Sequence, residues 1–217
     1  MSRYKILSSR RGAQLGRRGT LFVVSAPSGA GKTTLCREAR LVIPNLAYSV
    51  SATTRPARAG EVNGVDFRFV SEPHFRAMLE RQELAEWATV HGNLYGTPAK
   101  PLEAALADGK DVLLDIDTQG AAQLRRRYAE AVLVFIVAPS IAELEQRLRE
   151  RGADAEGDIA RRLARAREEI KLWRTYDYLI VNRDVKEAMD QLLAVIQAER
   201  CRTTRLSLTL PDLEVPE

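Results

Sequence analysis

The sequence has few cysteines, few aromatic residues and no long apolar run. Its 217 residues include two cysteines and 6% aromatic residues, while 29% are charged. Cys36 and Cys201 lie far apart and form no metal-binding pattern, so we expect reduced thiols and neither a disulfide nor a metal site there. No apolar segment approaches the roughly 18 residues of a membrane span, so we expect no membrane partner. These features favour a cytoplasmic protein with a single hydrophobic core.

Acidic residues are absent from the start of the chain, because none precedes Glu38. Six basic residues lie in the same region, namely Arg3, Lys5, Arg10, Arg11, Arg17 and Arg18. The segment lacks the apolar core of a secretory signal, and it only loosely resembles an organelle transit peptide. We therefore expect a disordered basic extension over residues 1–18. No recognisable motif accompanies these charges, so no specific nucleic-acid partner is expected.

Short apolar runs alternate with longer helical patterns along most of the chain. This alternation is typical of a parallel sheet covered by helices. Buried strands are predicted at residues 20–25, 111–116 and 132–137, with a short last strand at 178–181. Helical spacing predicts a helix after Lys32 that ends before Pro44, and further helices at 141–151, 158–173 and 185–202.

The pattern changes between about residues 51 and 97. Glycine, proline and arginine cluster there on either side of a predicted helix at 73–81, which indicates an inserted lobe. At the other end, residues 206–217 contain two prolines and no periodicity, so we expect a frayed terminus.

The strongest motif is the loop at residues 26–33, which reads Ala-Pro-Ser-Gly-Ala-Gly-Lys-Thr between a predicted strand and a predicted helix. This context is typical of a P-loop, whose backbone N–H groups and helix N-terminus bind polyphosphate. Lys32 is expected to contact the β- and γ-phosphates of ATP, and Thr33 to bind Mg²⁺. The first position is Ala26 instead of glycine, but the rest of the motif is complete. The predicted ATP-binding residues here are Ala26, Pro27, Ser28, Gly29, Ala30, Gly31, Lys32, Thr33 and Thr34.

Two further groups of charges suit phosphate and metal, although a P-loop by itself leaves GTPases, motor ATPases and kinases open. Arg55 and Arg58 lie on one loop, where two guanidinium forks suit a phosphate dianion; a solvated basic loop is the alternative. Asp115 and Asp117 end an apolar strand and face the same side of it. Asp115 is in the position of an acid that orients Mg²⁺ or its waters, unless these carboxylates are merely solvated.

Four motifs together resemble those of the guanylate kinase family, from about residue 20 to residue 200. They are APSGAGKTT, SVSATTRPARAGEVNGVDF, EWATVHGNLYGTP and LLDIDTQGA, in family order. The resemblance implies an α/β P-loop NTPase fold with a parallel sheet covered by helices. It implies a domain at 19–200 with a GMP-binding lobe at about 51–100 and a helical lid at about 147–165, followed by a tail at 201–217. It also implies transfer of the γ-phosphoryl group of ATP to GMP, and also to dGMP, giving ADP and GDP in purine nucleotide metabolism.

The resemblance assigns roles to individual residues. The implied GMP-binding residues are Ser51, Glu86 and Thr97 for guanine, Arg55, Arg58 and Tyr95 for the phosphate, and Asp117. The implied catalytic residues are Lys32, Arg147, Arg151 and Arg162, while Asn182 would lie near the adenine of ATP. A carboxylate such as Glu86 can accept hydrogen bonds from both N1–H and the N2 amine of guanine. Adenine offers neither donor, so a site of this kind rejects it.

Three positions depart from the family pattern. Phe67 stands where a tyrosine is frequent, which removes one donor to the GMP phosphate. Pro56 lies further forward than usual, and Arg183 replaces an acidic residue after Asn182. Two alternative functions remain at this point: a non-catalytic guanylate-kinase-like binding domain, and a kinase for another nucleoside monophosphate. The intact P-loop argues against the first, and Glu86 with Thr97 against the second.

Overall fold

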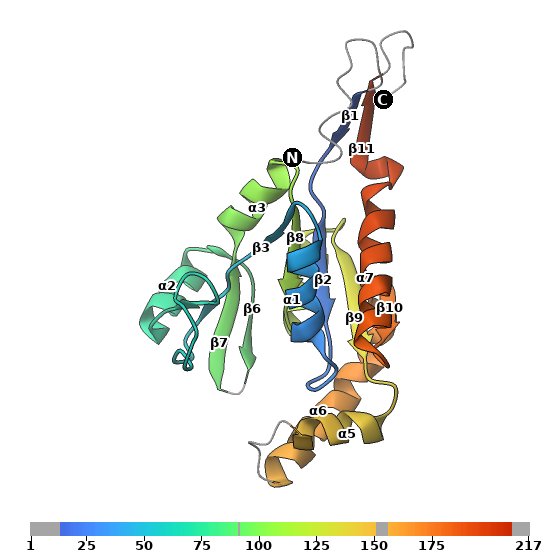
Figure 1. The fold of residues 1–217 in the computed structure, drawn as a ribbon. Coiled ribbons are helices and arrows are strands. Elements are labelled where there is room, and N and C mark those ends of the chain that lie inside the picture. Colours follow the sequence, from blue (N-terminus) through green and yellow to red (C-terminus); the bar gives the residue numbers. More distant parts are fainter. Residues whose placement is uncertain (1–13, 91, 151–155, 210–217) are drawn as a thin grey trace.

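The fold is built on a five-stranded parallel sheet, seen in a computed structural model that describes residues 14–90, 92–150 and 156–209 (Figure 1). The strand order is β10-β9-β2-β8-β3. The strands are β2 (Leu21–Ser25), β3 (Leu46–Tyr48), β8 (Asp111–Asp115), β9 (Val132–Val137) and β10 (Tyr178–Val181). Strands β2 and β9 are almost entirely apolar and buried, and β8 has a buried apolar centre at residues 112–114 between two aspartates, as expected for strands that are covered on both faces.

Helices cover both faces of this sheet. Side chains alternate along each strand, so Phe22 and Val24 pack under α1 (Lys32–Val42) and α7 (Val185–Arg200). Leu21 and Val23 pack on the opposite face, under α3 (Ala99–Ala107) and α4 (Thr118–Arg127). The α/β architecture and the predicted parallel sheet are therefore confirmed, whereas α3, α4 and β3 were not predicted.

Two helices project from one end of the core (Figure 1). They are α5 (Ile141–Glu150) and α6 (Glu156–Lys171), and the 3-10 turn η1 (Leu172–Thr175) follows α6. Their apolar faces join the core through Leu144, Leu148 and Leu163. Within the described part of the chain, no helix is both long and apolar enough to cross a membrane.

The segment predicted as an inserted lobe forms its own four-stranded sheet, in the order β5-β4-β7-β6. The elements are β4 (Ala52–Thr53), β5 (Arg68–Phe69), α2 (Glu72–Glu80), β6 (Leu84–Val90) and β7 (Asn93–Pro98). Ser71 caps α2 by accepting a hydrogen bond from the backbone N–H of His74, and Phe75 on that helix is fully buried in a small core. The lobe lies beside the main sheet, at the side of β3 and α3 (Figure 1).

The two ends of the described chain pair with each other, which differs from the expected disordered extension and frayed terminus. Strands β1 (Gln14–Arg17) and β11 (Leu206–Thr209) are antiparallel, and the short 3-10 turn η2 (Thr203–Arg205) precedes β11. Residues 1–13 and 210–217, which make up the rest of the predicted ends, lie outside the described residues.

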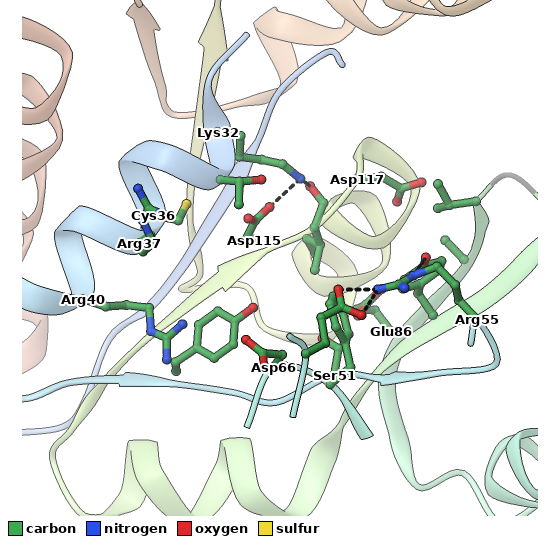
Figure 2. A pocket seen from close by; sticks show the side chains of 18 of the residues that line it. Lys32, Cys36, Arg37, Arg40, Ser51, Arg55, Asp66, Glu86, Asp115 and Asp117 are labelled. Carbon is green, nitrogen blue, oxygen red and sulfur yellow. Dashed lines mark hydrogen bonds and ion pairs between the residues drawn. The ribbon is translucent and has the colours of Figure 1, made fainter. Parts of the chain in front are cut away.

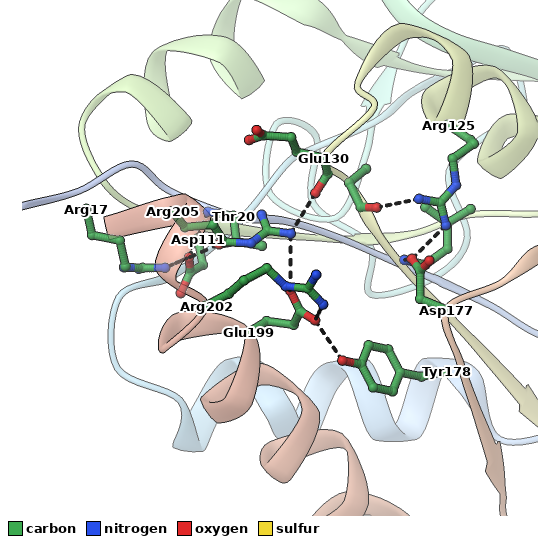
Figure 3. Close-up of polar contacts among 12 residues, drawn as sticks. Arg17, Thr20, Asp111, Arg125, Glu130, Asp177, Tyr178, Glu199, Arg202 and Arg205 are labelled. Carbon is green, nitrogen blue, oxygen red and sulfur yellow. Dashed lines mark hydrogen bonds and ion pairs between the residues drawn. The ribbon is translucent and has the colours of Figure 1, made fainter. Parts of the chain in front are cut away.

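A buried carboxylate explains why these ends are held (Figure 3). Asp111, at the start of β8, is fully buried and accepts from Arg17 at 2.6 Å and from Arg200 at 2.7 Å. It also accepts from the backbone N–H of Thr20 at 2.8 Å. Since a buried charge needs partners, this carboxylate fixes both the end of β1 and the end of α7 against the sheet.

Candidate active site

The P-loop takes its shape from two glycines and from an asparagine distant in sequence. Gly29 and Gly31 have φ angles of 91° and 93°, in the left-handed region that favours glycine. The Asn182 side chain donates a hydrogen bond to the Ala30 carbonyl at 2.8 Å, and a Cβ at Gly31 would clash with its Nδ2 atom. Asn182 is only 2% exposed. Its side chain thus supports the backbone of the P-loop, and a position near the adenine of ATP stays a prediction.

Lys32, the first residue of α1, reaches the carboxyl end of β8. Its Nζ atom lies 2.6 Å from an Asp115 carboxylate oxygen and donates to the Ile116 carbonyl at 2.8 Å. Burial lowers the pKa of Lys32, but the charge and hydrogen bond of Asp115 outweigh it and hold that pKa above its ordinary value. Lys32 is therefore an ammonium group at neutral pH within the loop that is predicted to bind phosphate.

A cavity of about 500 Å³ separates the lobe from the core. Figure 2 shows Ser51, Arg55 and Glu86 of the lobe on one side of it, and Lys32, Asp115 and Asp117 of the core on the other. The sequence-predicted residues that line it are Lys32, Thr33, Ser51, Arg55, Arg58, Glu86, Tyr95, Asp115 and Asp117. Residues predicted for two different ligands thus meet in one cavity.

Glu86, on β6, lines this cavity. It is only 4% exposed, and Thr97 on β7 donates a hydrogen bond to its Oε1 atom at 2.6 Å. The Ser51 hydroxyl lies 3.5 Å from that of Thr97. Burial raises the pKa of Glu86 to about 7, the hydrogen bond from Thr97 opposes the rise, and the nearby charge of Asp117 adds to it. The three predicted guanine-contacting residues are therefore in one hydrogen-bonded group.

Arg55 is held by two side-chain partners at the wall of the cavity. Its Nε atom donates to the Tyr95 hydroxyl at 3.1 Å, and its NH2 group donates to both Glu61 carboxylate oxygens, at 2.8 and 3.0 Å. Glu61 also accepts from the backbone N–H of Arg58 at 2.7 Å. The hydrogen bond with Glu61 raises the pKa of Arg55 and lowers that of Glu61. Glu61 was not predicted as a site residue, although it lies in the GEVNG stretch that follows the two arginines.

Phe67, the departure from the family pattern, also lines this cavity. Its ring meets that of Tyr95 edge to face, with 6.0 Å between centroids, and the Arg55 guanidinium lies 5.5 Å from its ring centroid. Phe67 thus occupies the ring position beside the predicted phosphate-binding residues, without a hydroxyl group.

The predicted lid arginines differ in where they point. Arg162 lines a second cavity of about 230 Å³ together with the P-loop residues 26–29 and 31–33. Arg147 instead forms an ion pair with Glu143 and donates to the backbone carbonyl of Asn182 at 2.9 Å, so it connects α5 to the end of β10. Arg151 lies outside the described residues.

Arg165 on α6 was not predicted, and it lines the P-loop cavity beside Arg162. It donates to Glu169 at 2.8 Å and lies 3.4 Å from Asp117, the residue that caps α4. Its spacing of three residues from Arg162 places both on one face of α6, which is the sequence signal that could have indicated it.

Comparison with known proteins gives a consistent result. The family described as guanylate kinase matches residues 18–199. The chain is 50% identical to the guanylate kinase of Geobacter metallireducens, over 90% of this chain and 97% of that one. It is 52% identical to the guanylate kinase of Syntrophotalea carbinolica, over 88% and 90% of the two chains.

A solved structure agrees with these relatives. The crystal structure of guanylate kinase from Anaplasma phagocytophilum superposes with a TM-score of 0.74 at 36% identity, covering 89% of this chain and 92% of that one. Sequence and fold thus both confirm the predicted P-loop NTPase architecture and the predicted kinase class. The chain belongs to the guanylate kinase family.

Proposed function

We propose that this chain transfers the γ-phosphoryl group of ATP to GMP, and to dGMP, giving ADP and GDP in the purine nucleotide metabolism of the cytoplasm. The observation that carries this proposal is the shared cavity, in which Lys32 and Asp115 of the core face Glu86 and Arg55 of the lobe (Figure 2). A phosphoryl donor on the P-loop and an acceptor in the lobe would meet in this cavity.

Guanine recognition rests on Glu86, Thr97 and Ser51. In its ionised form, Glu86 accepts hydrogen bonds from N1–H and the N2 amine of guanine. Thr97 and Ser51 supply hydroxyl groups for the part of the guanine edge that Glu86 does not contact. Asp117 lines the same cavity and adds acceptor capacity beside the base. An adenine ring would offer the buried Glu86 carboxylate no donor in place of N1–H and the N2 amine, and leaving these acceptor positions unpaired is costly.

The acceptor phosphate is bound by Arg55, Arg58 and Tyr95. Arg55 already has its guanidinium oriented by Tyr95 and Glu61. A phosphate dianion offers the same bidentate acceptor geometry as the Glu61 carboxylate and carries more charge. We therefore infer that GMP binding draws the Arg55 guanidinium from Glu61 onto the phosphate, where the Arg58 guanidinium joins it.

The residues near the P-loop fit Mg²⁺ that arrives with ATP. The Thr33 hydroxyl and the Asp115 carboxylate line the same cavity, and both are the hard oxygen donors that Mg²⁺ prefers. No group of three His, Cys, Asp or Glu side chains that could hold a metal is present among the described residues, so phosphate and water would complete the shell. When bound, Mg²⁺ neutralises charge on the β- and γ-phosphates.

The chain's own residues then align the reactants and stabilise charge. The acceptor is already an oxyanion, so no side-chain nucleophile or strong base is needed. Lys32 stabilises the developing charge between the β- and γ-phosphates, and Arg162 approaches from α6 across the P-loop cavity. Arg147 and Arg151 are proposed to join it when the lid closes and water is excluded. For Arg147 this requires it to leave Glu143.

A coupled assay of ADP release with GMP, dGMP, AMP, CMP and UMP as acceptors tests the proposal. We expect turnover with GMP and dGMP. Turnover with AMP, CMP and UMP should be at least about a hundredfold lower. Binding of GMP without any phosphoryl transfer would instead favour the non-catalytic alternative, and comparable turnover of AMP would contradict the proposed guanine site.

A further inference from the structure

The lobe is attached to the core helix α4 by a side-chain amide next to Glu86. Gln123 of α4 donates to the Trp87 backbone carbonyl at 2.6 Å and accepts from the Trp87 backbone N–H at 3.1 Å. Strand β6 is at the edge of the lobe sheet, so these two backbone groups have no neighbouring strand. The Gln123 amide therefore takes the place of a strand, and it fixes the backbone immediately after Glu86.

A glycine on the same helix gives the Glu86 carboxylate its place. Gly120 is buried in the first turn of α4, one turn before Gln123. A Cβ at this position would overlap the Glu86 Oε2 atom, and it would lie 3.1 Å from Glu86 Cδ and 3.2 Å from Ile116 Cδ1. The backbone of Gly120 has an ordinary helical conformation, since it is not among the described glycines with positive φ. Conformational freedom therefore does not explain glycine at this position, whereas the close approach of Glu86 does.

From these contacts we infer that Gly120 and Gln123 are positioning residues for guanine selectivity, which together set where the Glu86 carboxylate lies in the acceptor cavity. Gln123 fixes the strand, Gly120 leaves room for Oε2, and Thr97 holds Oε1. This inference rests on the proposed role of Glu86 in guanine binding.

The arrangement has a consequence for discrimination between bases. Two hydrogen bonds to guanine need both carboxylate oxygens in the plane of the base, and a displacement of about 1 Å is enough to weaken such bonds. A side chain at position 120 would push Oε2 away while leaving the charge in the cavity. The chain would then keep a carboxylate near the base but lose the geometry that distinguishes guanine from adenine.

Steady-state kinetics of two variants test the inference. Gly120→Ala is expected to raise the KM for GMP about tenfold or more, with kcat at saturating GMP within about threefold of the parent and the KM for ATP unchanged. Gln123→Leu, which keeps the size but removes both hydrogen bonds, should raise the KM for GMP by about three- to tenfold. Ala122→Ser adds one atom on the exposed side of the same helix, and Gln197→Leu changes an exposed glutamine on α7; both should match the parent.

A second readout separates positioning from loss of structure. Burial holds the pKa of Glu86 at about 7, so the affinity of the parent for guanosine, which carries no titrating phosphate, should fall as the pH falls through that value. In Gly120→Ala the carboxylate is displaced from its buried position, and the fall in affinity should begin at a lower pH. A purely structural defect would lower kcat for every acceptor and leave this pH unchanged.

The outcomes distinguish the inference from the proposed function. A KM for GMP within about twofold of the parent in folded Gly120→Ala overturns the inference, as does an equal loss for GMP and AMP. If Gly120→Ala fails to fold, Gln123→Leu decides alone, and an unchanged preference for GMP overturns the role of α4. Glu86→Gln is measured in parallel: if it leaves the preference for GMP over AMP intact, the proposed guanine site itself is wrong.

Discussion

Glu86 and Thr97 face each other across strands β6 and β7, with 2.6 Å between the Thr97 hydroxyl and a Glu86 carboxylate oxygen. The hydroxyl hydrogen points to the carboxylate, so Thr97 supports its ionised form in a place where burial disfavours charge. In its ionised form this carboxylate has the acceptors that a base with two adjacent donors requires, which is the basis of its proposed role in guanine binding.

Glu86→Gln is expected to weaken GMP binding by about 1.5–3 kcal/mol, the range of a hydrogen bond to a charged group. An amide cannot accept two donors as a carboxylate does, and its NH₂ group would oppose the guanine amine. The ratio of kcat/KM for GMP to that for AMP measures the effect. Glu83→Gln, at an exposed residue that pairs with Arg81 on the surface, is the control.

The affinity for guanosine should fall as the pH decreases through about 7, because protonated Glu86 can no longer accept two hydrogen bonds. The charges that face this carboxylate are Asp117, which raises its pKa, and Lys32, which lowers it. Isothermal calorimetry with guanosine avoids titration of the GMP phosphate. An affinity that is constant between pH 5.5 and 8 would contradict the position of Glu86 in the site.

The same pKa shift predicts an effect on stability. The folded state raises the pKa of Glu86 from 4.5 to about 7, so it binds this proton more tightly than the unfolded state does. The contribution is fully present below about pH 4.5 and is lost as the pH rises through about 7. Urea denaturation of the parent and of Glu86→Gln across this pH range measures the free energy of unfolding. Its change with pH should be smaller in the variant, which lacks this titrating group.

Lys32→Ala is expected to lower turnover by about a hundredfold or more while GMP binding stays within about threefold of the parent. Lys32 belongs to the P-loop and contacts Asp115 and the Ile116 carbonyl at the end of β8. It therefore lies on the side of the cavity that is proposed to hold ATP, the phosphoryl donor. Lys110→Ala, which removes an exposed ammonium group paired with Asp108, serves as the control. Turnover near that of the parent would refute the role of the P-loop lysine.

Phe67→Tyr should tighten GMP binding by about 0.5–1.5 kcal/mol, a roughly two- to tenfold lower KM, because it adds a neutral donor beside the acceptor phosphate. The Phe67 ring already packs edge to face on Tyr95 in the cavity wall. Guanosine, which has no phosphate, should bind the variant and the parent equally, and the KM for ATP should not change. An equal gain for guanosine would show that the ring does not lie beside the phosphate.

Asp111→Asn is expected to destabilise the fold by about 3–5 kcal/mol, because it leaves Arg17 and Arg200 in buried places without a charged acceptor. Kinetic constants at 25 °C should be those of the parent, since these residues lie at the opposite ends of the strands from the P-loop. Urea denaturation measures the loss. Asp108→Asn, at an exposed ion pair, is the comparison and should cost no more than about 1 kcal/mol.

Much of the fold could be predicted from local sequence. Strands β2 and β9 and the centre of β8 are apolar runs, and such runs are typical of strands that are buried on both faces. Helices α3 and α4 were not recognised, since α3 begins beside Pro101 and α4 ends in three consecutive arginines, which leaves each with a short apolar stripe. Apolar patterns in the local sequence indicate which residues are buried. In short helices these patterns contain few residues, so they are difficult to recognise.

The candidate site, like the fold, was predicted from the sequence only in part. Its chemistry was determined by the sequence: Lys32 in a P-loop, paired arginines at Arg55 and Arg58, and the carboxylate of Glu86 are read from motifs in family order. Whether each role is correct stays a prediction until the variants are measured. Only the tertiary structure decided which of these groups share a cavity, because contacts between distant segments depend on how the lobe packs on the core.

Several side chains acquired their partners only through folding. Asn182 donates a hydrogen bond to Ala30 of the P-loop, 152 residues away in sequence. Arg17 pairs with Asp111, 94 residues away in sequence. Gly120 leaves room for a carboxylate on another element. The sequence by itself determined which chemical groups the chain carries and the secondary structure around most of them. The tertiary structure decided their distances, burial and pKa values, since these depend on neighbours that no local pattern specifies.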